Sequence, residues 1–313
     1  MALLNRASTR VVGTETPVHV AFGADAAFAP HLATTLASIV ANAPGARFRF
    51  LIVHDGMPAG DQERIAEAAD GQEIDWREIT DDTFLSFDGW NHITRAGLYR
   101  LAIPELTDSD RIIYLDCDVV VLGDLRDLWA TDLNGNALGA VHDPGAPAEA
   151  YAARWGLPYR PLGYFNSGVL LIDLAKVREM SAFRQALTYL ATERGEFLRG
   201  DQDALNRVFW NAWTPLDPNW NVQRRMVVHL NAGPTFDTPE ALRARGRPKI
   251  VHYTEQYKPW HAEAWHPLTG LYLRYLRRTP YWQDIVQAAG ASPLKRLRHF
   301  LRTQWTLARL SRS

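Results

Sequence analysis

Two aspartates stand directly after an apolar run, at a spacing that suits a hard cation. The run 111–115 (RIIYL) predicts a strand, and Asp116 and Asp118 follow it with Cys117 between them. Residues two apart on an extended backbone point the same way, and ligands in open α/β sheets lie beyond the carboxyl ends of the strands. The two carboxylates could therefore converge on Mg²⁺ or Mn²⁺, and that cation could bridge to a diphosphate.

The same residues have structural alternatives. An Asp-x-Asp pair is expected about once by chance in a chain of this composition, and a second example occurs at 201–203. Asp116 and Asp118 could instead cap a helix or close a turn. His252 stands at the end of another apolar run and could complete a metal site, although a histidine in a strand is more often structural.

The elements that must hold these residues alternate between strands and helices. Apolar runs and two-residue alternation predict strands at 18–23, 47–53, 74–79, 111–115, 136–141, 168–172 and 250–253. Helical spacing predicts helices around 32–40, 61–69, 95–103, 181–194 and 202–210, with Pro104 ending the third of them. This alternation predicts parallel pairing and one α/β domain.

The domain boundaries follow from the same pattern. We expect a single domain over 17–270, a flexible N-terminus over 1–16 and a helical, basic C-terminal extension over 271–313. The proline-rich stretches 143–161 and 213–219 are expected to be loops over the site rather than boundaries.

Composition narrows the function classes. The chain has 313 residues, of which 47% are hydrophobic and 22% charged, as is ordinary for a soluble globular protein. Its formal net charge of -1 gives no electrostatic reason to expect nucleic-acid binding. With Cys117 as the single cysteine, neither an internal disulfide nor a cysteine-rich zinc site can form.

The absence of phosphate-binding and membrane motifs from the sequence is also informative. The sequence contains no Walker P-loop and no GxGxxG after the first predicted strand, so a bound diphosphate would need another source of positive charge. Met1 to Gly13 lacks the apolar core of a signal peptide, and no apolar run is long enough to span a bilayer. We therefore expect a cytoplasmic location.

The C-terminal residues suggest a membrane contact. From Ile285 onward no acidic residue occurs, while basic residues recur around Leu294, Leu297, Leu301 and Trp305, which fall near one helical face. Such a helix could lie on the inner face of an anionic membrane, so peripheral contact through 290–313 is one hypothesis. A helix packed on its own domain or a disordered end is the alternative.

Four ordered blocks resemble glycosyltransferase family 8, which includes glycogenin and bacterial lipopolysaccharide galactosyl- and glucosyltransferases. Residues 114–119 resemble its YLDxDxxV motif and 164–172 its FNxGVLLxxL block. Residues 200–206 resemble the DQDxLN block and 252–260 the HY...KPW block. The resemblance covers about 18–266, and four blocks in order are far more specific than one Asp-x-Asp.

The resemblance implies a GT-A fold, a single Rossmann-like nucleotide-sugar-binding domain with a mixed, mostly parallel sheet. It implies a retaining transferase that moves glucose or galactose from a UDP-sugar to an acceptor, such as a lipopolysaccharide or another cell-surface glycan. It also implies Mn²⁺ or Mg²⁺ as the cofactor, with three ligands: Asp116, Asp118 and His252.

The resemblance assigns donor-binding roles as well. It implies that Asp25 contacts the uracil, that Phe28 packs on the base and that Lys258 contacts the diphosphate. Arg100 and Asp116 are also implied to bind the donor. Contacts with the donor sugar are implied for Asp143, Asn166, Asp201 and Gln202. Ala27 departs from the asparagine that the family often has there, which removes one polar contact to the nucleoside.

The chemistry of the residue types agrees with these assignments but leaves structural alternatives open. A diphosphate leaving group needs cations, and a hexose needs fixed hydrogen-bond partners. Asn166 could equally belong to a turn, Asp201 could cap a helix, and Lys258 could be an ordinary surface lysine.

Retention could follow either of two routes. One is a double displacement through a covalent sugar–enzyme intermediate, and the other is front-face attack, in which the departing phosphate takes the acceptor's proton. Asp201 and Gln202 are the candidate nucleophile or stabiliser. Because glutamine is a poor nucleophile, front-face attack is our hypothesis.

Two other functions fit parts of the pattern. A phosphatase of the haloacid dehalogenase type also has Asp-x-Asp after a strand, but it expects Gly-Thr soon afterwards, where this chain has Val119-Val120. A non-catalytic protein that binds nucleotide-sugars would keep the fold without turnover.

Overall fold

The computed structural model describes residues 16–81, 84, 95–193, 197, 199–228, 246–254, 258–261 and 266–288. Within these residues, seven strands form one sheet in the order β3-β2-β1-β4-β7-β6-β8. Their bounds are β1 Val18–Gly23, β2 Phe48–His54, β3 Glu73–Glu78, β4 Arg111–Leu115, β6 Leu138–His142, β7 Phe165–Asp173 and β8 Thr214–Pro215. β7 runs antiparallel to both neighbours, and the other described pairings are parallel. The predicted α/β class with a mixed, mostly parallel sheet is confirmed.

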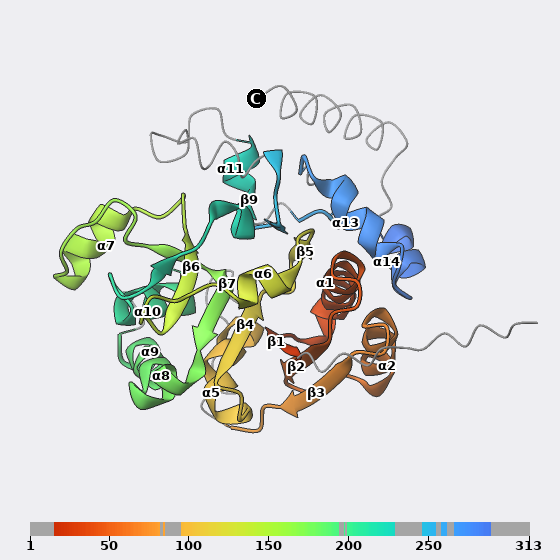
Figure 1. Cartoon of the computed structure of the whole chain (residues 1–313), viewed down its shortest axis with the longest axis horizontal. Helices are drawn as coiled ribbons and strands as arrows, with labels where there is room; N and C mark the ends of the chain where they lie inside the picture. The colour runs from red at the N-terminus through yellow and green to blue at the C-terminus, as the bar shows by residue number, and fades with distance from the viewer. Residues whose placement is uncertain are drawn as a thin grey trace, which may run out of the picture.

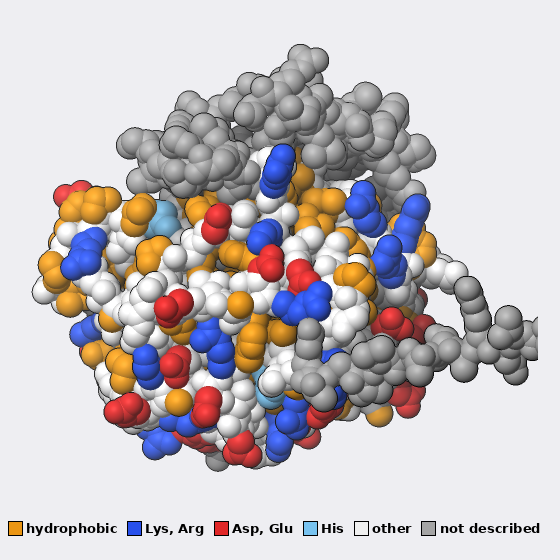
Figure 2. Space-filling model, in the orientation of Figure 1, with side chains coloured by type: hydrophobic (Ala, Val, Ile, Leu, Met, Phe, Trp, Pro, Cys, Tyr) orange, Lys and Arg blue, Asp and Glu red, His pale blue; other side chains and the backbone are white. Residues whose placement is uncertain are grey.

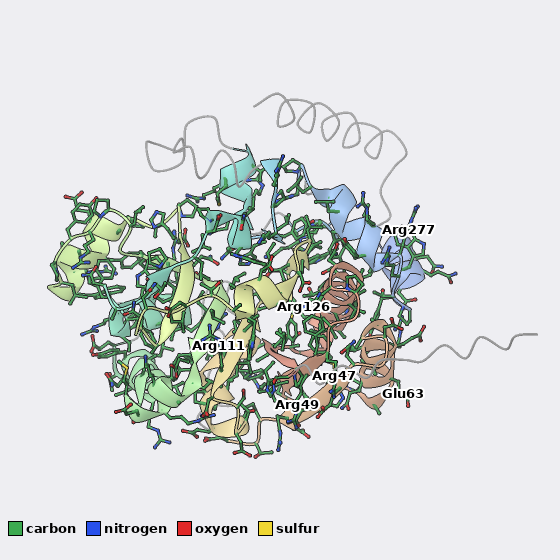
Figure 3. The ribbon with its side chains drawn as sticks, viewed as in Figure 1. Arg47, Arg49, Glu63, Arg111, Arg126 and Arg277 are labelled. Atoms are coloured by element: carbon green, nitrogen blue, oxygen red, sulfur yellow. The ribbon has the colours of Figure 1, made fainter. Side chains whose placement is uncertain are left out.

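The sheet is buried on both faces, which explains why its central strands read as apolar runs. In β1, Val20 and Phe22 face one hydrophobic core, while Ala21 between them faces the other. β3 lies at the edge of the sheet and is only partly buried. Arg49 of β2, labelled in Figure 3, is exposed and its Nε lies 2.9 Å from Glu73 Oε1 of β3.

Helices cover both faces of the sheet. The α-helices are α1 Ala29–Asn42, α2 Ala59–Ala68, α4 Arg95–Leu98, α5 Ile103–Leu106, α6 Leu125–Trp129, α7 Ala148–Trp155, α8 Leu174–Glu179, α9 Ala182–Thr192, α10 Asp201–Val208, α11 Arg224–Val228, α13 Thr269–Leu276 and α14 Trp282–Ala288. Short 3₁₀ turns are η1 Ala26–Phe28, η2 Tyr99–Ala102 and η4 Pro218–Asn221. α1 and α13 pack on one core, and α9 and α10 pack on the other.

Two predictions about local structure were wrong. Pro104 does not end the helix predicted over 95–103, because the chain turns through η2 and Pro104 then sits in the first turn of α5, where proline is tolerated. The stretch 143–161 is not all loop, since its alanine-rich middle forms α7. Gly156 ends α7 in a left-handed conformation with φ 64°.

A second, smaller sheet among the described residues joins β5 (Val119–Val121), β10 (Ile250–His252) and β9 (Val222–Gln223). β10 pairs antiparallel with β5, and His252 is in register with Val119. Figure 1 shows β5 and β9 near the top of the view, above β4 and β7. This pairing brings the chain end of β10 to the residues that directly precede β5.

The C-terminal helices belong to the packed domain. Tyr272, Tyr275 and Leu276 of α13 are buried in the same core as α1, and Figure 1 shows α13 and α14 beside α1. The Tyr272 hydroxyl lies 2.7 Å from His31 Nδ1, and Asn42 Nδ2 donates to the Tyr275 hydroxyl over 2.8 Å. Helix α13, which follows the expected boundary at 270, therefore packs on the same core as α1, and the boundary itself stays a prediction.

The visible surface of the protein carries charged side chains of both signs. In Figure 2, Lys and Arg side chains are interspersed with Asp and Glu across the visible face. No helix in the described part of the chain is long and apolar enough to cross a membrane. The proposed membrane segment 290–313 and residues 1–15 of the expected flexible N-terminus lie outside the described residues.

Replacing Leu276 with alanine tests the place of α13 in the core. Leu276 is fully buried, so Leu276→Ala should lower the free energy of unfolding by about 2–5 kcal/mol. Denaturant unfolding followed by circular dichroism would measure this change. Met180→Ala, at a residue that is 46% exposed, is the control and should stay within about 0.5 kcal/mol of wild type. Equal stability of both variants would place α13 outside the packed domain.

Candidate active site

The predicted site residues converge on one cavity of about 1110 Å³. It opens beyond the carboxyl ends of β1, β4 and β6, as expected for an open α/β sheet. Its lining includes all the predicted metal, donor and catalytic residues except Asp25: Phe28, Arg100, Asp116, Asp118, Asp143, Asn166, Asp201, Gln202, His252 and Lys258. Residues far apart in sequence are thus neighbours in one hollow.

Asp116, Asp118 and His252 form a cluster that could hold a metal ion. One ligand atom from each side chain can be chosen so that all lie within 4.8 Å of one another. His252 Nε2 lies 3.1 Å from Asp118 Oδ1 and 3.7 Å from Asp116 Oδ2. The β10–β5 pairing causes this proximity, because His252 is opposite Val119 and Asp118 directly precedes that strand.

The histidine is oriented by a hydrogen-bond chain behind it. Asn221 Nδ2 donates to Asn166 Oδ1 over 2.8 Å, so Asn221 Oδ1 is left to accept from His252 Nδ1 at 3.0 Å. With its proton on Nδ1, His252 presents the lone pair of Nε2 to the carboxylates. Such outer partners fix the ring and the tautomer of metal-binding histidines.

Two further observations show that this cluster fits a divalent cation. Asp118 Oδ1 is a buried oxygen with no hydrogen-bond partner among the described residues, and a cation would satisfy it. Gly168 lets two of the three side chains approach the backbone closely, because a Cβ there would lie 2.2 Å from His252 Cε1 and 2.6 Å from Asp116 Oδ2. Carboxylate oxygens with one imidazole suit Mn²⁺ better than Mg²⁺.

Arg100 joins the cluster to α10. Its guanidinium lies 3.1 Å from Asp116 Oδ1 and 2.7 Å from Asp201 Oδ2, and its Nη1 donates to the Ser167 carbonyl over 2.6 Å. Burial alone would lower the pKa of Arg100, but the carboxylates of Asp116 and Asp201 outweigh it and raise that pKa. Arg100 is therefore a permanent buried cation between two aspartates.

Asp201 is not the cap of α10. Gly200 is the N-cap residue, and Asp201 is the first helical residue, with its carboxylate buried against Arg100. Burial raises the pKa of Asp201 to about 6, although the charge of Arg100 opposes the shift. The capping alternative for Asp201 was wrong, since a tertiary ion pair uses the carboxylate instead.

Lys258 is not an ordinary surface lysine. Its ammonium donates to Asp118 Oδ2 and, over 2.7 Å, to the carbonyl of Tyr253. Burial would raise the pKa of Asp118, but the charge of Lys258 beside it lowers that pKa below its usual range. Asp118 therefore stays ionised and attracts cations at every physiological pH.

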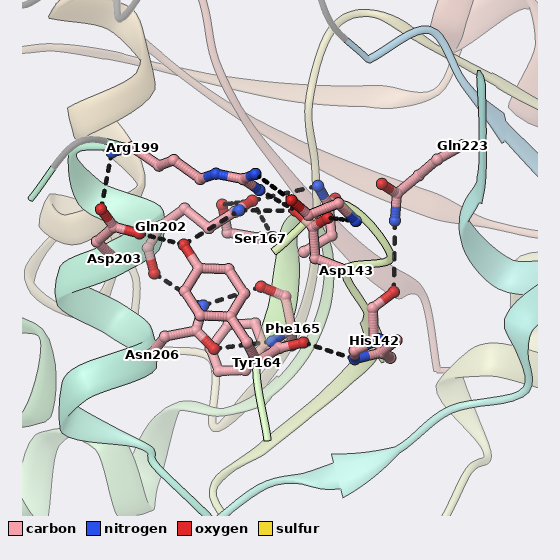
Figure 4. A network of polar contacts seen from close by, with 12 residues as sticks. His142, Asp143, Tyr164, Phe165, Ser167, Arg199, Gln202, Asp203, Asn206 and Gln223 are labelled. Carbon is pink, nitrogen blue, oxygen red and sulfur yellow. Dashed lines mark hydrogen bonds and ion pairs between the residues drawn. The ribbon is translucent and has the colours of Figure 1, made fainter. Parts of the chain in front are cut away.

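A network of polar side chains, shown in Figure 4, lines the same cavity as this charge cluster. Gln202 Nε2 donates to Asp143 Oδ2 over 2.9 Å, and Gln202 Oε1 accepts from Asn166 Nδ2 at 3.2 Å and from the Ser167 backbone NH at 3.0 Å. Arg199 Nη1 adds a contact of 2.9 Å to Asp143 Oδ2. These groups offer both donors and acceptors, as recognition of sugar hydroxyls requires.

The other end of the cavity is aromatic. His31 stacks on Trp260 with ring centroids 3.5 Å apart, and Phe28 meets both rings edge-on. Asp25 caps η1 by accepting from the Phe28 backbone NH over 3.0 Å, and it does not line the cavity. Its contact with a base therefore stays a prediction.

Sequence reasoning missed several lining residues. His31, Ser167, Arg199, Gln223 and Arg225 line the cavity but were not predicted as site residues. Ser167 lies inside a recognised block and could have been found there. The others belong to no block, so only the fold brings them to the site.

The family model described as Glycosyl transferase family 8 matches residues 19–264 of the chain. The chain belongs to glycosyltransferase family 8. General stress protein A of Bacillus subtilis is 29% identical over 280 residues, covering 86% of this chain and 96% of that protein. Lipopolysaccharide 1,2-glucosyltransferase of Escherichia coli K12 is 28% identical over 297 residues, covering 93% and 87%.

A solved structure supports the same assignment. The galactosyltransferase LgtC, in complex with donor and acceptor sugar analogues, is 26% identical, with a TM-score of 0.72 over 86% of this chain and 100% of that chain. The GT-A fold predicted from sequence is confirmed, and the chain is a hexosyltransferase. As in the rest of family 8, its substrates are in general terms a nucleotide-sugar and a glycan acceptor. The phosphatase alternative is thereby excluded.

Replacing Gly168 with alanine tests the packing at the candidate metal site of this family 8 enzyme. The new Cβ would clash with His252 Cε1 and Asp116 Oδ2, so Gly168→Ala should weaken Mn²⁺ binding by roughly tenfold to a hundredfold. Calorimetric titration would measure the affinity, and circular dichroism would verify the fold. Gly60→Ala is the control, since a Cβ there meets nothing within 4 Å. Unchanged Mn²⁺ affinity in Gly168→Ala would contradict a metal site at this cluster.

Proposed function

We propose that this enzyme transfers glucose or galactose from UDP to a cell-surface glycan, with retention and with help from a divalent cation. The observation that carries the proposal is the meeting of Asp116, Asp118 and His252 with Lys258 beside a polar pocket. Cations beside hydroxyl-binding groups are what a sugar diphosphate requires. The family assignment supports transfer, while the metal, UDP and the acceptor belong to this proposal.

Each end of the cavity has a proposed role toward the donor. Phe28 and its aromatic neighbours would pack on the base, and Asp143, Asn166 and Gln202 would bind the sugar hydroxyls. Mn²⁺ held by Asp116, Asp118 and His252 would neutralise charge on the departing diphosphate. Lys258 would turn from Asp118 to the diphosphate and add a second positive charge.

The contacts of Gln202 and Asp201 favour front-face attack. Gln202 Oε1 already accepts from Asn166 and Ser167, which reduces its reactivity toward an anomeric carbon. The Asp201 carboxylate is buried and lies against Arg100. We therefore assign Asp201 to orienting Arg100 and Gln202 to orienting the sugar, with the departing phosphate taking the acceptor's proton.

The acceptor is proposed from relatives. The E. coli relative is named a lipopolysaccharide 1,2-glucosyltransferase, and LgtC was solved with an acceptor sugar analogue. A lipopolysaccharide or another cell-surface glycan is therefore our proposed acceptor class. Peripheral contact with the inner face of the membrane, through 290–313, is part of the same proposal and rests on sequence alone.

Hydrolysis of a panel of nucleotide-sugars, with and without Mn²⁺, tests the reaction class. We expect Mn²⁺-dependent release of UDP from UDP-glucose or UDP-galactose. Asp118→Asn should lower the rate by at least a hundredfold, because a metal ligand and the partner of Lys258 are lost. The matched control is Asp127→Asn, at a half-exposed surface partner of Lys249. Tight binding of UDP and Mn²⁺ with no turnover of donor and glycan acceptors would instead support the non-catalytic alternative.

The pH profile of kcat/KM tests the role of Asp201. Below pH about 6 the Asp201 carboxyl holds a proton, so its attraction for Arg100 is lost and kcat/KM should fall as the pH drops through that value. Asp201→Asn should remove this dependence and retain activity reduced by roughly tenfold to a hundredfold. A sugar covalently attached to Asp201, detected by mass spectrometry, would contradict front-face attack.

A further inference from the structure

Helix α13 contacts the candidate site through the hydroxyl of one tyrosine. The Tyr272 hydroxyl lies 2.7 Å from His31 Nδ1. His31 lines the cavity, whereas Tyr272 is buried behind it and does not. Tyr272 also lies outside residues 19–264, which match the family model. This hydrogen bond therefore joins the site to a helix that follows the matched part of the chain.

The His31 ring holds the indole of Trp260 by stacking. The ring centroids are 3.5 Å apart, and the two planes differ by 15°. Burial lowers the pKa of His31 to about 3, so the ring is uncharged at neutral pH and stacks as an aromatic group. A stack this close needs a fixed imidazole plane, yet the torsion that turns this plane is soft. The hydrogen bond with the Tyr272 hydroxyl restrains that rotation.

Trp260 belongs to the same short turn as Lys258. The His261 backbone NH donates to the Lys258 carbonyl over 3.2 Å, which closes this turn. The Lys258 ammonium contacts Asp118 in the cavity. Because Trp260 stacks on His31 of α1, the stack joins the turn that carries Lys258 to that helix. The position of the ammonium therefore depends on how firmly the indole is held.

Tyr275 offers an internal comparison with Tyr272. It lies on the same helix and is also buried, and its hydroxyl accepts from Asn42 Nδ2 of α1 over 2.8 Å. Asn42 is the last residue of α1 and does not line the cavity. Loss of either hydroxyl removes a hydrogen bond between α13 and α1, but of the two only the Tyr272 bond ends on a residue of the site.

We propose that Tyr272 is a positioning residue for donor binding. Its hydroxyl fixes the plane of the His31 ring, the ring holds Trp260, and Trp260 holds the turn from which Lys258 reaches the donor diphosphate. This inference rests on the proposed function, because that function assigns Lys258 to the diphosphate. Tyr272 itself touches no substrate, so its effect must pass through His31.

Calorimetric titration of UDP into the protein saturated with Mn²⁺ tests this proposal. Tyr272→Phe should weaken UDP binding by about threefold to tenfold, because one buried hydrogen bond is lost while the ring that contacts Trp260 is kept. Tyr275→Phe is the matched control and should bind UDP like wild type. Denaturant unfolding should show a similar loss of stability in both variants, which separates the effect on UDP from an effect on the fold.

Two double-mutant cycles test the route from Tyr272 to Lys258. Lys258→Gln should itself weaken UDP binding, and adding Tyr272→Phe to it should cause little further loss, since coupled residues are not additive. His31→Phe keeps an aromatic ring but cannot bond the hydroxyl. It should weaken UDP binding about as much as Tyr272→Phe does, and the two together should weaken it no further. Circular dichroism of each variant verifies folding.

Other outcomes overturn the proposal. Wild-type affinity for UDP in Tyr272→Phe would show that the hydroxyl does not act on the donor. Equally weakened binding in Tyr272→Phe and Tyr275→Phe would assign the effect to a general loosening of α13. Additive losses in the cycle with Lys258→Gln would exclude the route through the turn. Failure of wild type to bind UDP with Mn²⁺ would instead refute the proposed function itself.

Discussion

The antiparallel pairing of β10 with β5 is the constraint on which the site depends. It sets His252 opposite Val119, and the ladder continues where the Tyr253 backbone NH donates to the Asp118 carbonyl over 3.0 Å. Lys258 then returns to the Tyr253 carbonyl. Two strands of three residues thus fix the histidine, the lysine and the second aspartate relative to one another. A one-residue slip in register would turn His252 to the opposite face.

Helix α1 also holds the turn that carries Asp116 and Asp118. Thr35 Oγ1 lies 3.1 Å from the Cys117 carbonyl and 2.8 Å from the Val119 carbonyl, and the Val121 backbone NH donates to Ser38 Oγ over 2.9 Å. These buried hydroxyls satisfy backbone groups that the short strand β5 leaves unpaired. The small polar residues of α1 therefore hold the Asp-x-Asp turn in place, and α13 packs on α1 in turn.

The sequence predicted the sheet well because its central strands are buried on both faces and so appear as continuous apolar runs. It predicted the start of β7 less well: the run of aliphatic residues begins near Gly168, yet the strand begins at Phe165. Pairing with β6 makes the difference, since His142 is in register with Phe165, and the Asn206 side chain adds to it by accepting from the Phe165 NH and donating to the Phe165 carbonyl. No local pattern at Phe165 encodes a contact with a residue 41 positions away.

The site residues, like the strands, were predictable from sequence only where a local motif contains them. The recognised blocks contain the three proposed metal ligands and Lys258, Asn166, Asp201 and Gln202, because each block carries its own motif. Arg199, Arg225 and His31 belong to no block and reach the cavity only in the folded chain. Local sequence patterns predict the strands and their ends, whereas the tertiary fold decides which other residues line the cavity.

The polar pocket shows how fold and specificity are joined. Gln202 and Asn206 are four residues apart in α10 and so lie on one face of the helix; Asn206 holds the start of β7, and Gln202 holds Asn166 and Asp143. Because these amides are already hydrogen-bonded to one another, a sugar bound there as proposed would exchange hydroxyl contacts for existing ones rather than fill empty positions. A hydroxyl of the wrong orientation would then break a protein hydrogen bond without replacing it, which leaves a buried polar group unpaired. Discrimination between glucose and galactose would therefore arise from that loss, and the rigidity of α10 on β7 would set its size.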